Sequence, residues 1–176
     1  MSGTPTCVVR GLTEDDWEVL RRIRLTALAE SPAAFETMFA DAAAWTDQRW
    51  RERARGSTTS RLFMAYRDDD PAGMAGVYAE DDGSAQVISV WVRPEQRRQG
   101  VARVLIAAAV DFAVAAGLSP VLVWVAEGNT AARCLYAELG FWVTGRHKPV
   151  RSQPSIEEHE MRLHRGPTTV AALRAG

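Results

Sequence analysis

The feature that most constrains the fold is a strand, a glycine turn and an apolar helix that follow one another without interruption. The stretch 87–106 reads VISVWVRPEQRRQGVARVLI: an apolar run ends at Val92, a basic turn ends at Gly100, and an apolar helix then continues to Gly117. The run PVLVWV at 120–125 is continuously apolar, which is typical of a strand buried on both faces. This succession predicts a right-handed crossover between parallel strands.

Changes of hydrophobic period divide the first half of the chain. Residues 7–9 suit a short strand, and residues 13–31 predict a helix that begins at a threonine cap and ends before a proline. Residues 32–54 are expected to form a loop that leads into a second helix. Three strand-like runs between 61 and 92, separated by Asp-rich turns, predict an antiparallel meander.

The second half continues the alternation of strands and helices. Asn129 is a suitable N-cap for a helix that ends near Gly140. Two final strands, 141–147 and 157–165, are expected to flank a loop at 148–156.

The predicted order of elements is therefore β-α-α-β-β-β-α-β-α-β-β. It corresponds to an α/β fold with a mixed, mostly antiparallel sheet and one parallel β-α-β crossover. At 176 residues the length fits one domain, which we place at 6–165, and we expect residues 166–176 to form a flexible C-terminal tail.

Charge and composition exclude several classes of partner. The net charge is −1, so no overall field draws the chain to nucleic acid or to an anionic membrane. The first residues lack the pattern of a signal peptide, and the longest apolar run, 101–116, is too short to span a bilayer. Cys7 and Cys134 lie far apart without metal-ligand spacing. We expect a cytoplasmic protein with no metal and with buried thiols.

The glycine turn is a candidate anion site. The first amides of a helix have no partner inside it and carry partial positive charge, and a glycine allows a ligand to approach them closely. Arg97, Arg98 and Arg103 add cationic side chains around Gly100. Neither of the common phosphate motifs, G-x-x-x-x-G-K-S/T or G-x-G-x-x-G, is present. The alternative is a plain helix start with solvated arginines.

Here the sequence resembles a known family, the GNAT superfamily of acetyl-CoA-dependent N-acetyltransferases. Arg97-x-x-Gly100-x-Ala102 is similar to the family signature Q/R-x-x-G-x-G/A, which follows the fourth strand. The stretch 121–141, VLVWVAEGNTAARCLYAELGF, is similar to the family's succession of strand, Asn, helix, Tyr and Gly-Phe. The order of elements from about residue 6 to 165 also agrees.

The resemblance implies a role for each matching position. Backbone amides from Arg98 to Arg103 would hold the pyrophosphate of acetyl-CoA, the main chain of Val90 to Val92 would pair with the pantetheine arm, and one amide there would polarise the thioester carbonyl. Asn129 would touch the pantetheine or simply cap its helix. The expected cofactor-binding residues are Val90, Trp91, Val92, Arg97, Arg98, Gln99, Gly100, Val101, Ala102, Arg103 and Asn129.

The implied activity is transfer of an acetyl group to a primary amine by direct attack. Tyr136 matches the family's proton donor to the departing thiolate, although its helical stripe would also suit a core residue. At the two positions where some family members carry a glutamate that acts as the general base, this chain has Gln86 and Trp124. Other candidate bases are Glu80, Asp81, Asp82, Glu127 and His147; a water chain or an amine that binds already neutral are alternatives.

The acceptor is expected to be the amine of a small molecule. Alternatives are a protein N-terminus or lysine, and a catalytically weak acyl-CoA-binding module. An aromatic pocket wall, acidic residues that suit a cationic amine, and basic residues that suit a carboxylate are all candidates. The family often dimerises, so a homodimer is compatible with the resemblance. The wall candidates are Phe35, Phe39, Trp124 and Trp142; the acidic ones are Glu80, Asp81 and Asp82; the basic ones are Arg146, His147, Lys148 and Arg151.

Overall fold

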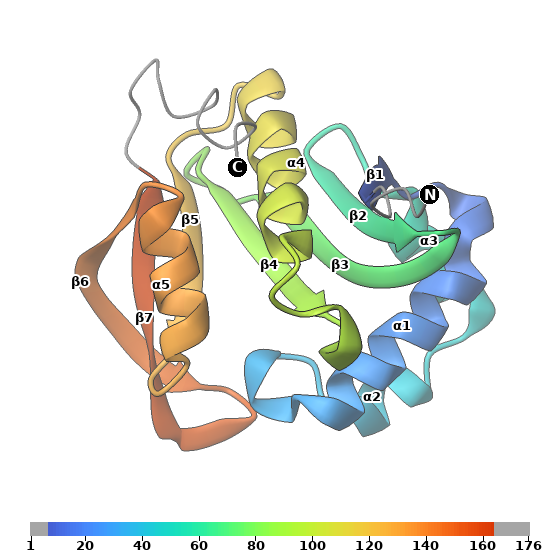
Figure 1. Cartoon of the computed structure of the whole chain (residues 1–176), viewed down its shortest axis with the longest axis horizontal. Coiled ribbons are helices and arrows are strands. Elements are labelled where there is room, and N and C mark those ends of the chain that lie inside the picture. Colours follow the sequence, from blue (N-terminus) through green and yellow to red (C-terminus); the bar gives the residue numbers. More distant parts are fainter. Residues whose placement is uncertain (1–6, 164–176) are drawn as a thin grey trace, which may run out of the picture.

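Seven strands form one mixed sheet in the computed structural model, which describes residues 7–163 (Figure 1). The strand order is β1-β2-β3-β4-β5-β7-β6, and β4 with β5 is the parallel pair. This confirms the predicted fold class and crossover. The expected tail lies outside the described residues. The strands are β1 Cys7–Gly11, β2 Ser60–Arg67, β3 Asp70–Ala79, β4 Ala85–Val92, β5 Val121–Ala126, β6 Phe141–Val150 and β7 Gln153–Leu163.

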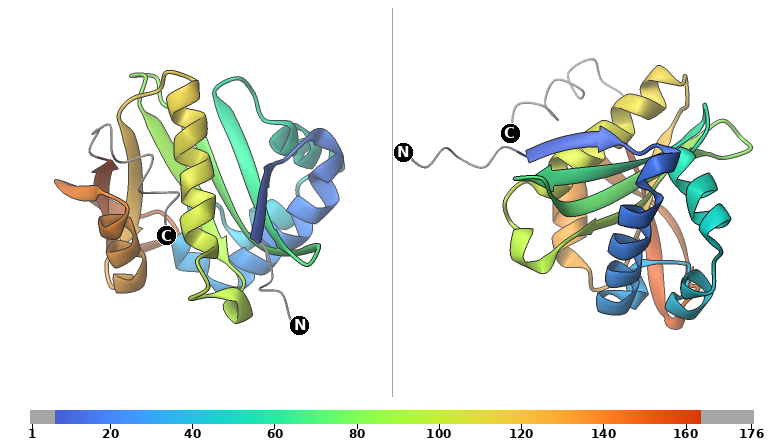
Figure 2. Two further views of the ribbon diagram at one scale, coloured as in Figure 1. Left: turned by 45° about the horizontal axis from the view of Figure 1, so that its top comes forward. Right: turned by 90° about the vertical axis from the view of Figure 1, so that its right-hand side faces the viewer.

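Helices cover both faces of the sheet (Figure 2). α4 and α5 pack on one face, whereas α1 and α3 pack on the other. Short 3-10 turns, η1 Glu14–Asp16, η2 Pro32–Ala34 and η3 Pro94–Gln96, precede or follow these helices. The helices are α1 Trp17–Glu30, α2 Phe39–Ala43, α3 Asp47–Arg55, α4 Val101–Ala115 and α5 Thr130–Glu138.

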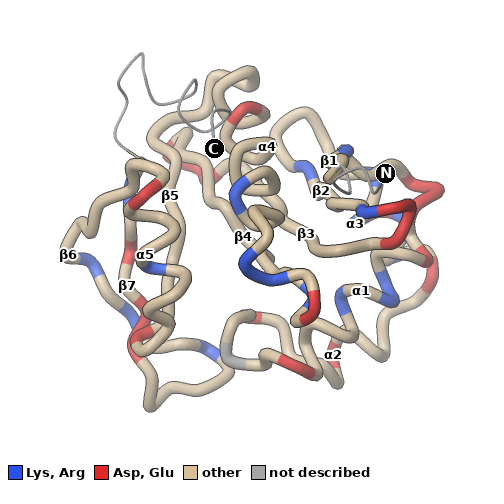
Figure 3. The backbone as a smooth tube through the Cα atoms, viewed as in Figure 1, with Lys and Arg blue, Asp and Glu red and all other residues tan. Residues whose placement is uncertain are grey.

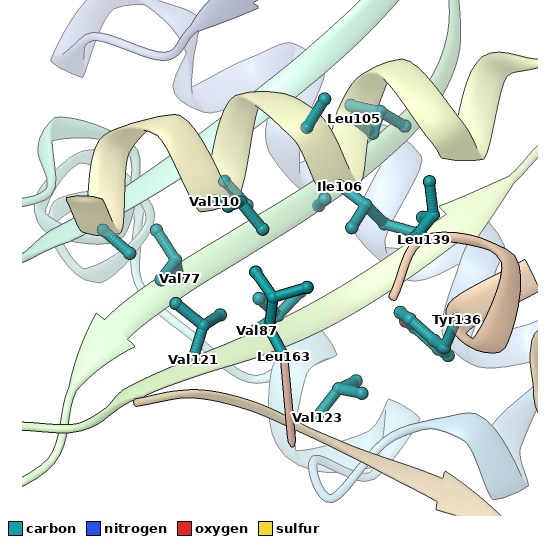
Figure 4. Packing of buried hydrophobic residues seen from close by; sticks show 14 of the residues in the cluster. Val77, Val87, Leu105, Ile106, Val110, Val121, Val123, Tyr136, Leu139 and Leu163 are labelled. Carbon is teal, nitrogen blue, oxygen red and sulfur yellow. The ribbon is translucent and has the colours of Figure 1, made fainter. Parts of the chain in front are cut away.

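Side chains alternate between the two faces of the strands, so the sheet has one hydrophobic core on each face, beneath the helices that cover it. On the α4 face, Leu105, Ile106 and Val110 pack against Val87 and neighbouring strand residues (Figure 4). On the opposite face, α1 and α3 pack over Met64 and Met74, and Trp50 of α3 is fully buried there. The sheet is therefore buried on both sides where β3 and β4 cross the centre of the molecule.

Two predicted segments differ from the structure. The single helix expected after residue 32 is divided into α2 and α3, because Thr46 starts a new helix by accepting a hydrogen bond from the Arg49 amide at 3.3 Å. The loop expected at 148–156 is mostly strand, since β6 and β7 pair Lys148 with Glu158 and continue to Val150 and Gln153. The extension brings the polar ends of both strands beside η2, where the Ser152 hydroxyl donates to the Pro32 carbonyl at 3.2 Å (Figure 1).

The start of the first helical segment contains an ionic cap whose effect on stability depends on pH. Asp16 accepts hydrogen bonds from the Thr13 amide at 2.8 Å and from the Arg10 guanidinium at 2.7 Å. The Arg10 bond is the largest cause that lowers the pKa of Asp16 from 3.8 to about 2. A depressed carboxyl pKa stabilises the fold above pH 3.8, and this contribution is lost as the pH falls through 2.

Asp16→Asn is therefore expected to lower the free energy of unfolding at neutral pH by about 1 kcal/mol, the usual value of a helix cap. The difference from wild type should shrink between pH 4 and pH 2, as measured by urea unfolding. Asp15→Asn is the control, because Asp15 is exposed and forms no hydrogen bond or ion pair within residues 7–163. A loss that stays constant down to pH 2 would contradict the ionic cap.

Candidate active site

The parallel pair of strands separates soon after it begins, which opens the sheet. β4 and β5 are paired only from Ala85 to Val87, and they then diverge (Figure 1). Ser89 lies in β4 with a positive φ of 58°, and the pairing of β3 with β4 shifts register at this point, as in a β-bulge. The remainder of β4 is thus left without a neighbour on the β5 side.

A cleft of about 1410 Å³ occupies this opening. Its lining comes from both faces of the sheet: α4 and α5 contribute on one face, and α1, α3 and η2 on the other. The cleft therefore passes through the sheet and has two ends. One end lies at the glycine turn before α4, and the other lies among α1, α3 and the ends of β6 and β7.

The glycine turn presents its backbone to the first end of the cleft. Arg98 and Gly100 both have positive φ, at 64° and 80°, and nothing lies within 4 Å of the position that a Cβ would take on Gly100. The first hydrogen bond of α4 runs from the Val104 amide to the Gly100 carbonyl at 3.2 Å. The preceding amides have no partner inside the helix, so the turn forms a concave anion cradle.

The arginines of this turn contribute less charge than the sequence suggests. Arg97 is paired with Glu30 at 2.9 Å and donates to the Val92 carbonyl at 3.0 Å, and Arg103 is paired with Glu138 at 2.8 Å. Within the described chain, Arg98 alone of these three forms no ion pair or hydrogen bond. The cradle is therefore mainly a property of the backbone, with the basic segments around it visible in Figure 3.

Glu30 joins the turn to β4. Its Oε2 accepts hydrogen bonds from the Trp91 indole and from Arg97, each at 2.9 Å. The Ser31 hydroxyl, the Trp91 indole and Arg97 together hold the pKa of Glu30 below its usual range, so the carboxylate is ionised at neutral pH. The Trp91 side chain is thus turned into the α1 core, while the residue also lines the cleft beside Val90 and Val92.

The remaining cofactor-binding candidates also line the cleft. Gln99 is held by a hydrogen bond from Arg67, a contact that the sequence did not indicate. Asn129 caps α5 by accepting from the Ala132 amide at 3.2 Å, which confirms its structural role. The structure brings all eleven candidates except Gln99 into the cleft lining: Val90, Trp91, Val92, Arg97, Arg98, Gly100, Val101, Ala102, Arg103 and Asn129.

Tyr136 lies on α5 where the core meets the cleft. Its ring is 5% exposed and packs edge-on against Phe141, with 5.4 Å between ring centroids; Figure 4 shows it beside Leu139 at the margin of the buried cluster. Its hydroxyl forms no hydrogen bond within the described residues. Burial raises the pKa of Tyr136, so the phenol stays protonated at neutral pH and is able to donate.

The candidate bases separate into those inside and those outside the cleft. Glu80 lines it and accepts a hydrogen bond from the Tyr78 hydroxyl at 2.9 Å. Asp81, Asp82, Glu127 and His147 do not line it; His147, for example, is paired with Glu157 at 2.8 Å.

A carboxylate that the sequence did not single out lies at the second end of the cleft. Glu158 of β7 is 3.4 Å from the Lys148 ammonium, which also contacts Glu36 at 3.3 Å and lies over the Trp124 ring. Burial raises the pKa of Glu158, and Lys148 opposes this effect. Glu158 lies in the predicted strand 157–165, and the period-two rule places it on the same face as Glu160, which pairs with Trp124.

Of the other candidates for the acceptor site, some line the cleft and others lie outside it. Phe35 and Trp124 line the cleft, whereas Phe39 and Trp142 are exposed outside it, at 45% and 48%. Of the basic candidates only Lys148 reaches the cleft. Cys134 was expected to be buried; it is exposed, because it lies on the outer side of α5 at the cleft.

Within residues 7–163, no group of three or more His, Cys, Asp or Glu side chains is placed to hold a metal ion. In the same part of the chain, none of the helices has the length and apolar character needed to cross a membrane.

Comparison with known proteins gives a family and a fold. Residues 23–141 match the model of the Acetyltransferase (GNAT) family. The mycothiol acetyltransferase of Rhodococcus erythropolis is 31% identical over 138 residues, which cover 73% of this chain and 43% of that protein. The chain spans less than half the length of the curated relatives that it matches.

Solved structures show the same architecture. A putative acetyltransferase from Salmonella typhimurium, solved with its cofactor acetyl-CoA, has a TM-score of 0.73 at 23% identity and covers 92% of this chain and 98% of its own. Nourseothricin acetyltransferase has a TM-score of 0.55 at 29% identity, over 60% of this chain and 65% of its own. The first likeness shows the fold, which agrees with the split sheet described above.

Proposed function

The chain belongs to the GNAT family of acetyltransferases, and from this premise we propose that it transfers an acetyl group from acetyl-CoA to the primary amine of a small molecule by direct attack. The observation that carries the proposal is the open glycine turn directly beside the unpaired part of β4. A diphosphate needs several amides within reach, and an extended thioester arm needs a free strand edge. The cleft offers both in one continuous lining.

The turn and the strand have separate tasks in this proposal. Amides from Arg98 to Arg103 bind the pyrophosphate, and the open position at Gly100 leaves room for it. The main chain of Val90 to Val92 binds the pantetheine arm and directs one amide at the reacting carbonyl, where developing negative charge is stabilised. Acetyl-CoA, when bound, supplies the acetyl group as an activated thioester.

Tyr136 completes the transfer by donating its proton to the departing sulfur. A thiol has a pKa of about 8.5, so the departing thiolate is basic enough to take a proton from a positioned donor. The Tyr136 hydroxyl has no competing partner in the described chain and remains protonated because its ring is buried. Core packing and proton donation are compatible, since the ring packs on Phe141 and the residue lines the cleft.

A small acceptor is supported by the lining of the second end of the cleft and by the relatives. Residues of α1, α3, η2 and the ends of β6 and β7 surround that end on several sides, which favours a compact molecule over a folded protein. The mycothiol acetyltransferase takes its name from mycothiol, and the nourseothricin acetyltransferase takes its name from nourseothricin; neither is named for a protein.

Acetyl-CoA-dependent release of free thiol across a panel of small amines and peptides tests this proposal. We expect turnover on at least one small amine and none on peptide N-termini or lysines. Turnover on peptides alone would transfer the assignment to protein acetylation. If calorimetry shows that acetyl-CoA binds but no acceptor leads to thiol release, the chain is a binding module and not a transferase.

A further inference from the structure

Three arginines from the helices opposite α4 line the second end of the cleft. Arg24 belongs to α1, and Arg49 and Arg53 belong to α3. Within the described residues, none of the three forms an ion pair with a carboxylate, in contrast to Arg97 and Arg103 at the first end of the cleft. Glu36, Glu52, Glu80 and Glu158 also line the cleft, but in the described structure none of them pairs with these three guanidinium groups, which leaves the three free to bind an anion from outside.

Arg24 is the most confined of the three. Its side chain is 4% exposed, its Nη1 donates to the Ser89 hydroxyl at 2.7 Å, and its guanidinium lies over the Phe35 ring at 4.4 Å. Its Nε is buried without a hydrogen-bond partner. Burial and, to a lesser extent, the charge of Arg53 lower the pKa of Arg24 to about 9, so it remains cationic at neutral pH. An unpaired buried charge is costly unless a ligand completes it.

Arg49 and Arg53 extend the positive charge from Arg24. Both guanidinium groups lie over the Trp45 ring, at 4.4 and 5.8 Å. The Arg53 Nε is also buried without a partner, and burial followed by the charge of Arg49 lowers the pKa of Arg53. Each arginine thus raises the positive potential felt by the next. The three form one cationic wall, defined here as Arg24, Arg49 and Arg53.

The cationic wall is adjacent to the place where the acetyl group would lie. Ser89, which accepts from Arg24, is the bulged residue of β4 and directly precedes Val90. Under the proposed function, Val90 to Val92 position the thioester. An anion bound by Arg24 is therefore close to the reacting carbonyl, and the amine that attacks this carbonyl must be close to the anion.

We propose that the acceptor is a small amine that carries a carboxylate within a few bonds of its amino group, as an α-amino acid does, and that the cationic wall binds this carboxylate. The proposal rests on the proposed function, because it assumes that the acetyl group is presented at β4. Arginine suits this task since its planar fork matches a carboxylate in two parallel hydrogen bonds. At the wall itself a second ammonium group would meet three like charges, so a polyamine is disfavoured there.

The wall also explains how the acceptor amine loses its proton in a chain that has Gln86 and Trp124 in place of a basic side chain. A positive potential near the amine favours loss of its ammonium proton to water, so that the neutral amine is available at neutral pH. The amine nitrogen then forms its bond to the acetyl carbon as the carbon–sulfur bond breaks. The nitrogen releases its second proton to water, the sulfur receives one from Tyr136, and Tyr136 regains a proton from water, which leaves an amide and a free thiol.

The test compares amino acids with their carboxamides, using glycine, alanine, methionine, phenylalanine and glutamate as probes. We expect wild-type kcat/KM to be about 100-fold higher for the acid than for the amide, because a buried charge pair is lost in the amide. The amine of the carboxamide is less basic, so a larger fraction of it is neutral at neutral pH. A higher rate on the acid therefore cannot come from amine ionisation. Equal rates on acids and amides, or preferred turnover of a polyamine, would overturn the proposal.

Arg24→Met keeps the side-chain volume and removes the charge. We expect the acid-to-amide ratio to fall about 100-fold, with acetyl-CoA affinity unchanged and a melting temperature equal to or above that of wild type, because an unpaired buried charge has been removed. A lower melting temperature with an unchanged ratio would make Arg24 a purely structural residue. Arg53→Met serves as a second variant if Arg24→Met does not fold.

Arg21→Met is the matched control on the same helix, because the Arg21 side chain is 41% exposed, paired with Asp47 at 3.3 Å and outside the cleft. It should leave the ratio unchanged. If wild type turns over no probe, calorimetry with the coenzyme-A-loaded protein measures binding of acid and amide directly; tighter acid binding that Arg24→Met abolishes supports the wall even where the transferase assignment fails. Tighter binding of aminoalkylphosphonates than of amino acids would overturn the carboxylate assignment.

Discussion

Gly100→Glu is expected to abolish measurable binding of acetyl-CoA while the fold survives. The new side chain would extend from a position with no atom within 4 Å, so it would meet no protein group and would enter the cradle instead. Its carboxylate would occupy the place of a phosphate and satisfy the free amides at the start of α4. We expect the Kd for acetyl-CoA, measured by calorimetry, to rise at least 100-fold, because the new carboxylate and the pyrophosphate are both negative and compete for one site.

The control for this variant must reproduce the backbone strain. Gly100 has a φ of 80°, a conformation that costs a non-glycine residue roughly 1 kcal/mol or more. Gly83 in the turn before β4 has a φ of 82° and the same open surroundings, so Gly83→Glu carries equal strain and an equal charge away from the cradle. It should bind acetyl-CoA normally. Unchanged affinity in Gly100→Glu would show that the turn does not hold the cofactor.

Tyr136→Phe is expected to lower kcat about 100-fold, a typical effect of losing a general acid, with little change in acetyl-CoA affinity. The ring and its edge-on contact with Phe141 are retained, and the lost hydroxyl has no hydrogen-bond partner in the described part of the chain. Stability should therefore stay near that of wild type. Steady-state kinetics and thermal unfolding measure the two effects separately.

Tyr66→Phe is the matched control for this substitution. Tyr66 lies on β2 away from the cleft and accepts a hydrogen bond from Arg10 at 3.0 Å. Its loss should affect stability slightly and leave kcat unchanged. Normal turnover of Tyr136→Phe would return Tyr136 to the hydrophobic core and would leave proton donation to water.

The crossover and the cradle were predictable because their determinants are local. The run ending at Val92, the glycine at position 100 and the apolar helix after it are contiguous in sequence, and each acts on its own backbone. The last strands were harder to predict. Lys148 is polar and lies in the stretch 148–156 that resembles a loop, until it pairs with Glu158 of the last strand and its ammonium is placed against Glu36 and Trp124.

The same distinction separates the two ends of the active site. Arg97 looked like a phosphate ligand from its spacing to Gly100, but Glu30 is brought to it from α1, 67 residues away in sequence. Arg24 and Arg53 lie in helical segments that resemble ordinary amphipathic helices. Their burial in the cleft could not be predicted, because it depends on how α1 and α3 pack over β4.

The sequence by itself determined where the backbone can bind an anion, since conformation at Gly100 and the unpaired amides of α4 follow from neighbouring residues. Only the tertiary structure decided which charged side chains remain unpaired in the cleft. Pairing depends on distances between elements far apart in sequence: Arg97 and Arg103 are neutralised by α1 and α5, whereas the wall of Arg24, Arg49 and Arg53 is not. That difference in pairing is the physical basis for assigning an anionic acceptor.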